Sequence, residues 1–187
     1  MRSLLKVGLA AGFAAILLFG NASISTAQQA DEAAELNKKV IELYNAGRYA
    51  EAIPIAQQVL AIREKALGAN HPDVAISLNS LALLYHSQGR YADAEPLYQR
   101  ALTIREEALG RDNPDVATSL NNLAELYRNQ GRYADAEPLY RRSLGIKEKT
   151  LGRDHPDVAN SLNNLALLYY NQGRYADALP IIRRTLS

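Results

Sequence analysis

Residues 115–152 read DVATSLNNLAELYRNQGRYADAEPLYRRSLGIKEKTLG. Residues 73–110 have nearly the same sequence, with 27 of the 38 positions identical. The tetrapeptide GRYA, followed by Asp or Glu and then Ala, begins at Gly47, Gly89, Gly131 and Gly173, in steps of 42 residues. A period between about 20 and 50 residues is typical of stacked-repeat architectures. The sequence therefore predicts four tandem copies of one structural unit.

Each unit predicts two α-helices separated by a glycine. The first helix has one apolar face at the i, i+3, i+4, i+7 spacing, formed by Leu78, Leu81, Ala82 and Tyr85 in the second unit. Pro72 suits the first turn of this helix, where its missing N–H costs nothing, and Gly89 suits the end. His71 stands at the cap position and is expected to be a weaker cap than Asn113 in the next unit. A second helix is expected from about Tyr91 to Leu109.

The overall composition excludes several functional classes. The chain has 187 residues, and its 21 Lys and Arg nearly balance its 20 Asp and Glu. That balance argues against a general nucleic-acid binder, which usually needs a basic excess. Seven or more of the 11 tyrosines also recur at expected core positions of the unit, where they are not free to stack on bases. The chain contains no Cys, which excludes disulfides and thiolate metal sites.

The first 27 residues have the layout of a secretory signal peptide. Arg2 and Lys6 precede an apolar run from residue 7 to residue 19, and the segment ends in Ser25-Thr26-Ala27, a small-x-small cleavage site. Cleavage after Ala27 would leave residues 28–187 in the periplasm or outside the cell, with no stable membrane span. An uncleaved anchor is the weaker interpretation, because a spanning helix needs about 20 apolar residues.

The motif Asn-x-Leu-Ala-x-Leu-Tyr followed by Gly-Arg-Tyr-Ala-Asp-Ala-Glu-Pro-Leu-Tyr resembles the tetratricopeptide repeat. Its tail, ending in Leu-Gly-Arg-Asp-Asn-Pro-Asp-Val-Ala, is similar to the 42-residue variety found in kinesin light chains and in many bacterial proteins. The expected repeats span approximately residues 31–72, 73–114, 115–156 and 157–187. The resemblance implies an all-α chain folded as a right-handed α-solenoid. It also implies that the first helix of each pair lines a concave groove.

Two of the four copies depart from the pattern. In the first, Lys39 replaces an inward Leu, and the pair Leu43-Tyr44 stands one residue closer to its glycine than in the other copies. The fourth copy stops at Ser187 inside its second helix, although repeat stacks usually need a polar capping element. Ile181, Ile182 and Leu186 are therefore expected to be partly exposed, and a homodimer through this end is possible.

Differences between the units predict which face is free to vary. In the first helix of the second and third units, four of the five differences follow an i, i+4, i+7, i+11 spacing. This stripe lies nearly opposite the apolar face, and the resemblance implies that it lines the groove. Twelve residues make up what we call the variable stripe: Ile76, Thr118 and Asn160; Leu83, Glu125 and Leu167; His86, Arg128 and Tyr170; Ser87, Asn129 and Asn171.

A repeated amide runs beside the variable stripe at Asn79, Asn121 and Asn163, which we call the asparagine ladder. An Asn side chain offers two donors and an acceptor, which suits the backbone of an extended peptide. Tetratricopeptide families use groove asparagines in this way, and the resemblance implies the same role here. Alternatively, these side chains bond neighbouring helices and only hold the stack together.

Charged and catalytic candidates are few. Arg128 lies three residues from Glu125, so it either reads a charged ligand group or forms an intrahelical pair. The recurring Arg90, Arg132 and Arg174 are expected to be either solvated or paired with a nearby carboxylate. No nucleophile elbow or phosphate-binding loop appears, and no cofactor or metal is expected.

The sequence thus predicts a non-enzymatic scaffold that binds a peptide or protein partner. Two alternatives remain open at this stage. The chain could be a structural protein that self-associates through its fourth unit, or it could be the repeat portion of a longer signalling protein whose effector domain is absent.

Overall fold

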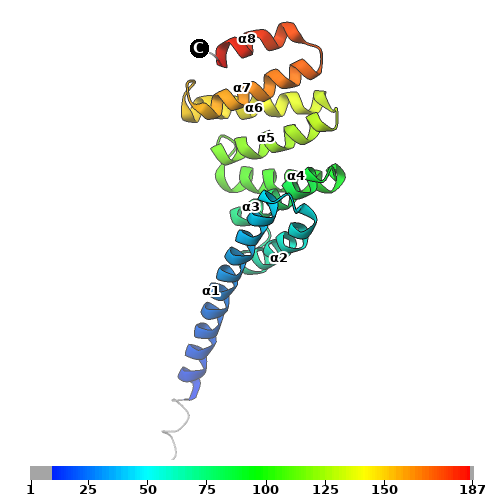
Figure 1. The fold of residues 1–187 in the computed structure, drawn as a ribbon. Coiled ribbons are helices and arrows are strands. Elements are labelled where there is room, and N and C mark those ends of the chain that lie inside the picture. Colours follow the sequence, from blue (N-terminus) through cyan, green and yellow to red (C-terminus); the bar gives the residue numbers. More distant parts are fainter. Residues whose placement is uncertain (1–9, 186–187) are drawn as a thin grey trace, which may run out of the picture.

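The computed structural model describes the backbone of residues 10–185 and the side chains of residues 27–185, which form a stack of helix pairs (Figure 1). The helices are α1 (Ala10–Asn45), α2 (Tyr49–Leu67), α3 (Pro72–Ser87), α4 (Tyr91–Leu109), α5 (Pro114–Asn129), α6 (Tyr133–Leu151), α7 (Pro156–Asn171) and α8 (Tyr175–Thr185). No strand occurs within the described range. The prediction of an all-α repeat solenoid is confirmed, and the second helix of the second unit has the predicted bounds.

The first helix is longer than its counterparts and extends away from the stack (Figure 1). It runs without a break past Ala27, the residue after which cleavage is expected. Residues 1–9 lie outside the described part of the chain, as do the side chains up to residue 26, so the signal peptide stays a prediction. Among the described residues, none of the helices is both long and apolar enough to cross a membrane.

Each later first helix begins at a proline behind a capping side chain. Asn113 Oδ1 accepts a hydrogen bond from the Asp115 amide at 2.8 Å, as the sequence predicts. His71 and His155 also cap their helices with a side chain. Nδ1 of each ring accepts a hydrogen bond from the backbone amide two residues later in the sequence, at 3.1 Å. The ring nitrogen of each His thus takes the place of the Asn oxygen, at a longer distance.

The core follows the predicted apolar faces. Leu78, Leu81, Ala82 and Tyr85 are all buried, and so are their counterparts in the third and fourth units. From the second helices, Ala94, Tyr98 and Ala101 pack against them with at most 1% exposure. Of the seven tyrosines expected in the core, three are buried (Tyr85, Tyr127 and Tyr169), three are half-buried (Tyr49, Tyr91 and Tyr133), and Tyr175 is 57% exposed.

The first unit has a different register from the one that its Leu-Tyr pair suggests. The Arg48 amide donates to the Leu43 carbonyl at 2.8 Å, as the Arg90 amide does to Tyr85 at 2.9 Å. Leu43 therefore occupies the place of Tyr85, and Tyr44 occupies the place of His86. This agrees with the sequence, in which the Leu-Tyr pair stands one residue closer to its glycine than in the other copies, and it shows that the helix-ending glycine sets the register.

The fourth unit ends with an uncovered apolar surface, as expected. Leu179 and Ile182 on α8 are 55% and 41% exposed, and Ile181 is half-buried. Leu186 lies outside the described residues. In the second and third units the position of Leu179 holds Glu95 and Glu137, which contact the following unit.

Candidate partner-binding face

The variable stripe lies on the side of α3, α5 and α7 that faces away from the core. Ile76, Thr118 and Asn160 are exposed, and so are Ser87, Asn129 and Asn171. Leu83 and Glu125 are half-buried, whereas Leu167 is 44% exposed. His86 and Arg128 are also half-buried, and Tyr170 is 60% exposed. Every predicted stripe residue therefore reaches the surface to some degree, along three consecutive first helices.

The asparagine ladder joins these helices directly. Asn122 Nδ2 donates to Asn79 Oδ1 at 2.8 Å, and Asn164 Nδ2 donates to Asn121 Oδ1 at the same distance. The acceptor oxygens of Asn79 and Asn121 thus hold neighbouring units together. Their own Nδ2 groups have no hydrogen-bond partner among the described residues. One half of each amide is structural, and the other half is available to a partner.

The middle of the face carries a connected polar group. Arg128 Nη2 donates to Glu125 Oε1 and to Asn129 Oδ1, both at 3.3 Å. Asn129 Nδ2 lies 2.7 Å from His86 Nε2. The intrahelical pair that the sequence allowed is therefore present. Asn129 extends this group of polar side chains from α5 to His86 on α3.

The pKa values of nearby groups reflect this environment. Burial lowers the pKa of His86 below its ordinary value of 6.5; the charge of Glu125 opposes this effect and that of Arg128 adds to it. Burial also raises the pKa of Tyr98 and Tyr140 far above the usual range, and the Glu125 carboxylate contributes to both increases. The Tyr140 hydroxyl is buried and has no hydrogen-bond partner among the described residues. The charge of Glu125 thus acts on two core tyrosines.

The first unit adds two residues that the sequence comparison missed. When residues are counted back from the glycine after each first helix, Tyr44 falls in the series of His86, Arg128 and Tyr170. Ile41 falls in the series of Leu83, Glu125 and Leu167. Ile41 is 51% exposed, and the Tyr44 ring stacks on Tyr49 with centroids 5.4 Å apart. A strict 42-residue step counted from Gly47 would have found both. The candidate face therefore extends over four first helices.

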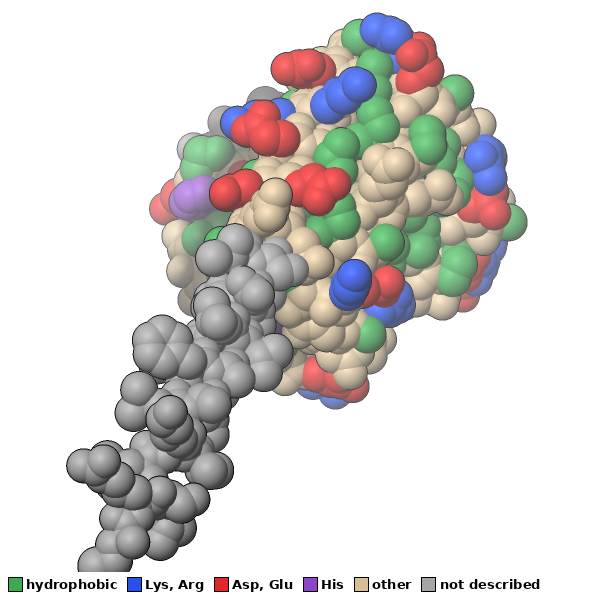
Figure 2. Space-filling model, turned by 90° about the horizontal axis from the view of Figure 1, so that it is seen from below, with side chains coloured by type: hydrophobic (Ala, Val, Ile, Leu, Met, Phe, Trp, Pro, Cys, Tyr) green, Lys and Arg blue, Asp and Glu red, His purple; other side chains and the backbone are tan. Residues whose placement is uncertain are grey.

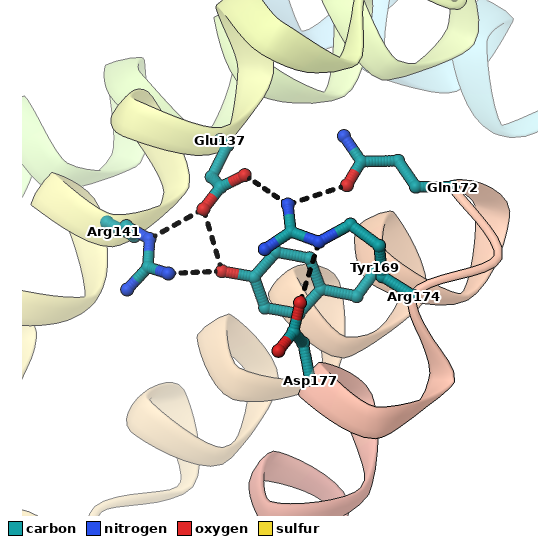
Figure 3. A network of polar contacts seen from close by, with 6 residues as sticks. All are labelled: Glu137, Arg141, Tyr169, Gln172, Arg174 and Asp177. Atoms are coloured by element: carbon teal, nitrogen blue, oxygen red, sulfur yellow. Dashed lines mark hydrogen bonds and ion pairs between the residues drawn. The ribbon is translucent and has the colours of Figure 1, made fainter.

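The recurring arginines of the Gly-Arg-Tyr turn belong to the stack. Figure 3 shows Arg174, which bonds Asp177 in its own helix pair and Glu137 in the preceding one, both at 2.7 Å. Its guanidinium lies 4.3 Å from the centre of the Tyr169 ring, and the Tyr169 hydroxyl donates to Glu137 at 2.9 Å. Arg132 repeats this arrangement one unit earlier. Of the two alternatives expected for these arginines, pairing with a carboxylate is the one that is found.

Hollows and charged side chains also lie outside the variable stripe. Among the described residues, no group of three or more His, Cys, Asp or Glu could hold a metal ion. Hollows lie at the N-terminal end instead, one of them between α1, α2 and the start of α3, lined by Ala33, Ile62 and Asp73 among others. Figure 2 shows acidic and basic side chains interspersed on this end of the molecule.

Comparisons with known proteins agree with the helix pairs. The family model described as "Tetratricopeptide repeat" matches residues 43–107, 74–149 and 115–187. A search of curated proteins found no match.

Solved structures give a similar result. A protein from Podosopora anserina, described as a kinesin light chain with nearly identical TPR-like repeats, is 26% identical, with a TM-score of 0.74 over 81% of this chain and 72% of that one. BtubC (BKLC) from P. vanneervenii (23% identity, TM-score 0.60, covering 88% and 72%) and apo RapI (19% identity, TM-score 0.70, covering 83% and 54%) share the fold. The chain belongs to the tetratricopeptide repeat family.

Proposed function

We propose that the chain is an exported, non-enzymatic scaffold that binds a peptide segment or partner protein across its first helices. Tetratricopeptide repeats generally mediate protein–protein interaction. The observation that supports this function most directly is an exposed face whose residues change from unit to unit over a core that hardly changes. Packing keeps Leu78 and its counterparts constant, but it does not explain the series Leu83, Glu125 and Leu167.

The asparagine ladder provides a test that separates binding from stacking. Asn121→Asp keeps the oxygen that accepts from Asn164 and removes the two amide donors. Asn164→Ala removes the stacking hydrogen bond and leaves Asn121 in place. We expect Asn121→Asp to weaken partner binding by about 1–3 kcal/mol, roughly 5- to 150-fold, at nearly unchanged stability. Asn164→Ala is expected to lower stability and to keep the partner.

The experiment is affinity capture from the envelope fraction of the source organism with residues 28–187 as bait. The parent, Asn121→Asp and Asn164→Ala are compared after their helicity has been matched. Binding at raised salt controls for the charge that Asp adds. If Asn121→Asp and the parent retain the same partners equally, the ladder is structural only and the proposed groove contact is wrong.

Export is the second part of the proposal. The basic start, the apolar run and the Ser25-Thr26-Ala27 ending support it. The mass of the protein isolated from its source tests it directly. A chain that begins at Gln28 supports cleavage, whereas an intact Met1 contradicts it.

A self-associating structural protein is the other candidate, and the exposure of Leu179 and Ile182 favours it. In that case light scattering would give a mass that rises with concentration. Ile182→Asp would return it to the monomer value. A constant monomer mass over a wide concentration range would exclude this candidate.

A further inference from the structure

We propose that the partner segment is extended, with apolar or aromatic side chains at both ends and a basic side chain at its centre. This inference rests on the proposed function and adds the chemistry of the ligand. It arises from the way in which the exposed residues change along the four first helices.

Both ends of the face are apolar. Ile41 at one end and Leu167 at the other are 51% and 44% exposed. Next to each lies a pair of tyrosines with ring centroids 5.4 Å apart, Tyr44 with Tyr49 and Tyr170 with Tyr175. The first pair is half-buried and the second is exposed. Aromatic rings bury much apolar area with little loss of side-chain freedom, so each end suits one large apolar side chain of the partner.

The centre of the face presents a carboxylate. Glu125 is the charged member of a series that otherwise reads Ile41, Leu83 and Leu167. Its side chain is 42% exposed, whereas that of its partner Arg128 is only 11% exposed. The arginine therefore lies beneath, and the surface that meets a ligand is the acid.

The carboxylate of Glu125 also retains capacity to accept. A carboxylate has about four acceptor sites, and Arg128 supplies one hydrogen bond, at 3.3 Å. The neighbouring His86 Nε2 lies 2.7 Å from the amide nitrogen of Asn129, so it acts as an acceptor, and the ring is neutral. A Lys or Arg of the partner would supply the missing donors, whereas an acidic side chain would meet the carboxylate first and be repelled.

Helix packing sets the length of the segment. The Asn79–Asn122 and Asn121–Asn164 hydrogen bonds show that neighbouring first helices are in contact at this face. Packed helices lie about 8–10 Å apart, so the two steps from α3 to α7 span about 16–20 Å, and a further step of the same 42-residue repeat to α1 brings the length to about 24–30 Å. An extended chain covers this distance in about seven to nine residues, at roughly 3.3 Å each.

Selection from a library of random peptide twelve-mers displayed on phage tests the proposal. The targets are the purified parent protein, Glu125→Lys, and the matched control Glu107→Lys, which makes the same charge change on the exposed part of α4. We expect the parent and the control to enrich peptides with Lys or Arg between two apolar residues. Glu125→Lys is expected to change the central preference to Asp or Glu.

Affinities of single peptides complete the test. A selected Lys-centred peptide should lose about tenfold or more in affinity when its Lys becomes Glu, or when Glu125→Gln replaces the parent. The Gln variant keeps the size of the side chain, so it covers the case in which Glu125→Lys fails to fold beside Arg128.

The outcomes separate this inference from the proposed function. Enriched peptides that are lost with Asn121→Asp but lack the pattern would leave the scaffold function intact and overturn the ligand chemistry. A central acidic consensus on the parent, or one indifferent to Glu125, would overturn it as well. Failure to enrich any peptide would contradict groove binding itself.

Discussion

At the scale of single residues, equivalent positions of the repeated units can be compared with one another. Gly145 stands inside α6 where the second unit has Thr103, and its backbone is ordinary helix, unlike that of the turn glycines. A β-carbon at Gly145 would meet nothing within 4 Å. The glycine therefore carries the entropic cost of a flexible residue without a steric reason for it.

Gly145→Ala is expected to stabilise the protein by about 0.5–1 kcal/mol, because alanine loses less backbone freedom on folding. The measurement is chemical denaturation followed by circular dichroism. Gly131→Ala is the matched control: that residue has φ +75°, which alanine adopts only with strain, so stability should fall. A loss of stability in Gly145→Ala would show that the site is more crowded than its surroundings indicate.

His86 provides a prediction about pH. Burial lowers its pKa below 6.5, so the unfolded chain binds the proton more tightly than the folded one. This contribution to stability is complete above pH 6.5 and is lost as the pH falls through the folded pKa. NMR titration of the ring should give the low pKa, and His86→Gln should remove this part of the slope of stability against pH. An ordinary pKa for His86 would contradict the buried, neutral ring.

At the scale of elements, the units are linked by a repeated network rather than by apolar contact alone. Glu137 accepts from Tyr169, Arg141 and Arg174, so one carboxylate of α6 contacts α7 and the turn that leads into α8 (Figure 3). Glu95 does the same for the third unit through Tyr127 and Arg132. In the first unit Ile53 replaces this acid and is buried, which makes that junction apolar.

Glu137→Gln is expected to loosen the fourth unit selectively. Burial raises the pKa of Glu137, but the hydrogen bonds from Arg174, Tyr169 and Arg141 outweigh it and hold the pKa below 4.5. The stabilisation is therefore present above pH 4.5 and is lost as the pH falls through the lowered value. Hydrogen exchange should become faster in α7 and α8 of the variant, with α3 unchanged. Equal acceleration in all helices would contradict a local junction.

The elements could be predicted from the sequence because each is fixed by local chemistry repeated four times. Proline starts, glycine ends and the apolar spacing together gave the bounds of α4 correctly. In the first unit, Leu43 fills the place of a tyrosine, so the register follows only from the 42-residue step to Gly47 and not from the Leu-Tyr pair. The bonding partners of Asn79 and Asn121 could not be predicted, because each accepts from a residue 43 positions away.

At the scale of the whole molecule, helices pack chiefly on their neighbours in the chain, with a weaker contact between α5 and α7. The stability of such a stack is roughly the sum of its units and of the junctions between them. Ion pairs between successive second helices, such as Arg100 with Glu64 and Arg184 with Glu148, repeat at each step. Each junction therefore has an ion pair of this kind, and no single junction holds the whole chain.

Removal of residues 157–187 is accordingly expected to leave α1–α6 folded. The deletion takes away α7 and α8 and leaves Glu137 without Tyr169 and Arg174, but it removes no contact within the first three units. The midpoint of denaturation should fall, and the helical signal should drop only in proportion to the residues lost. Circular dichroism with denaturant titration measures both. Loss of nearly all helicity would show that the stack folds as one cooperative body, and the hydrogen exchange of α7 in the full chain would then match that of α3.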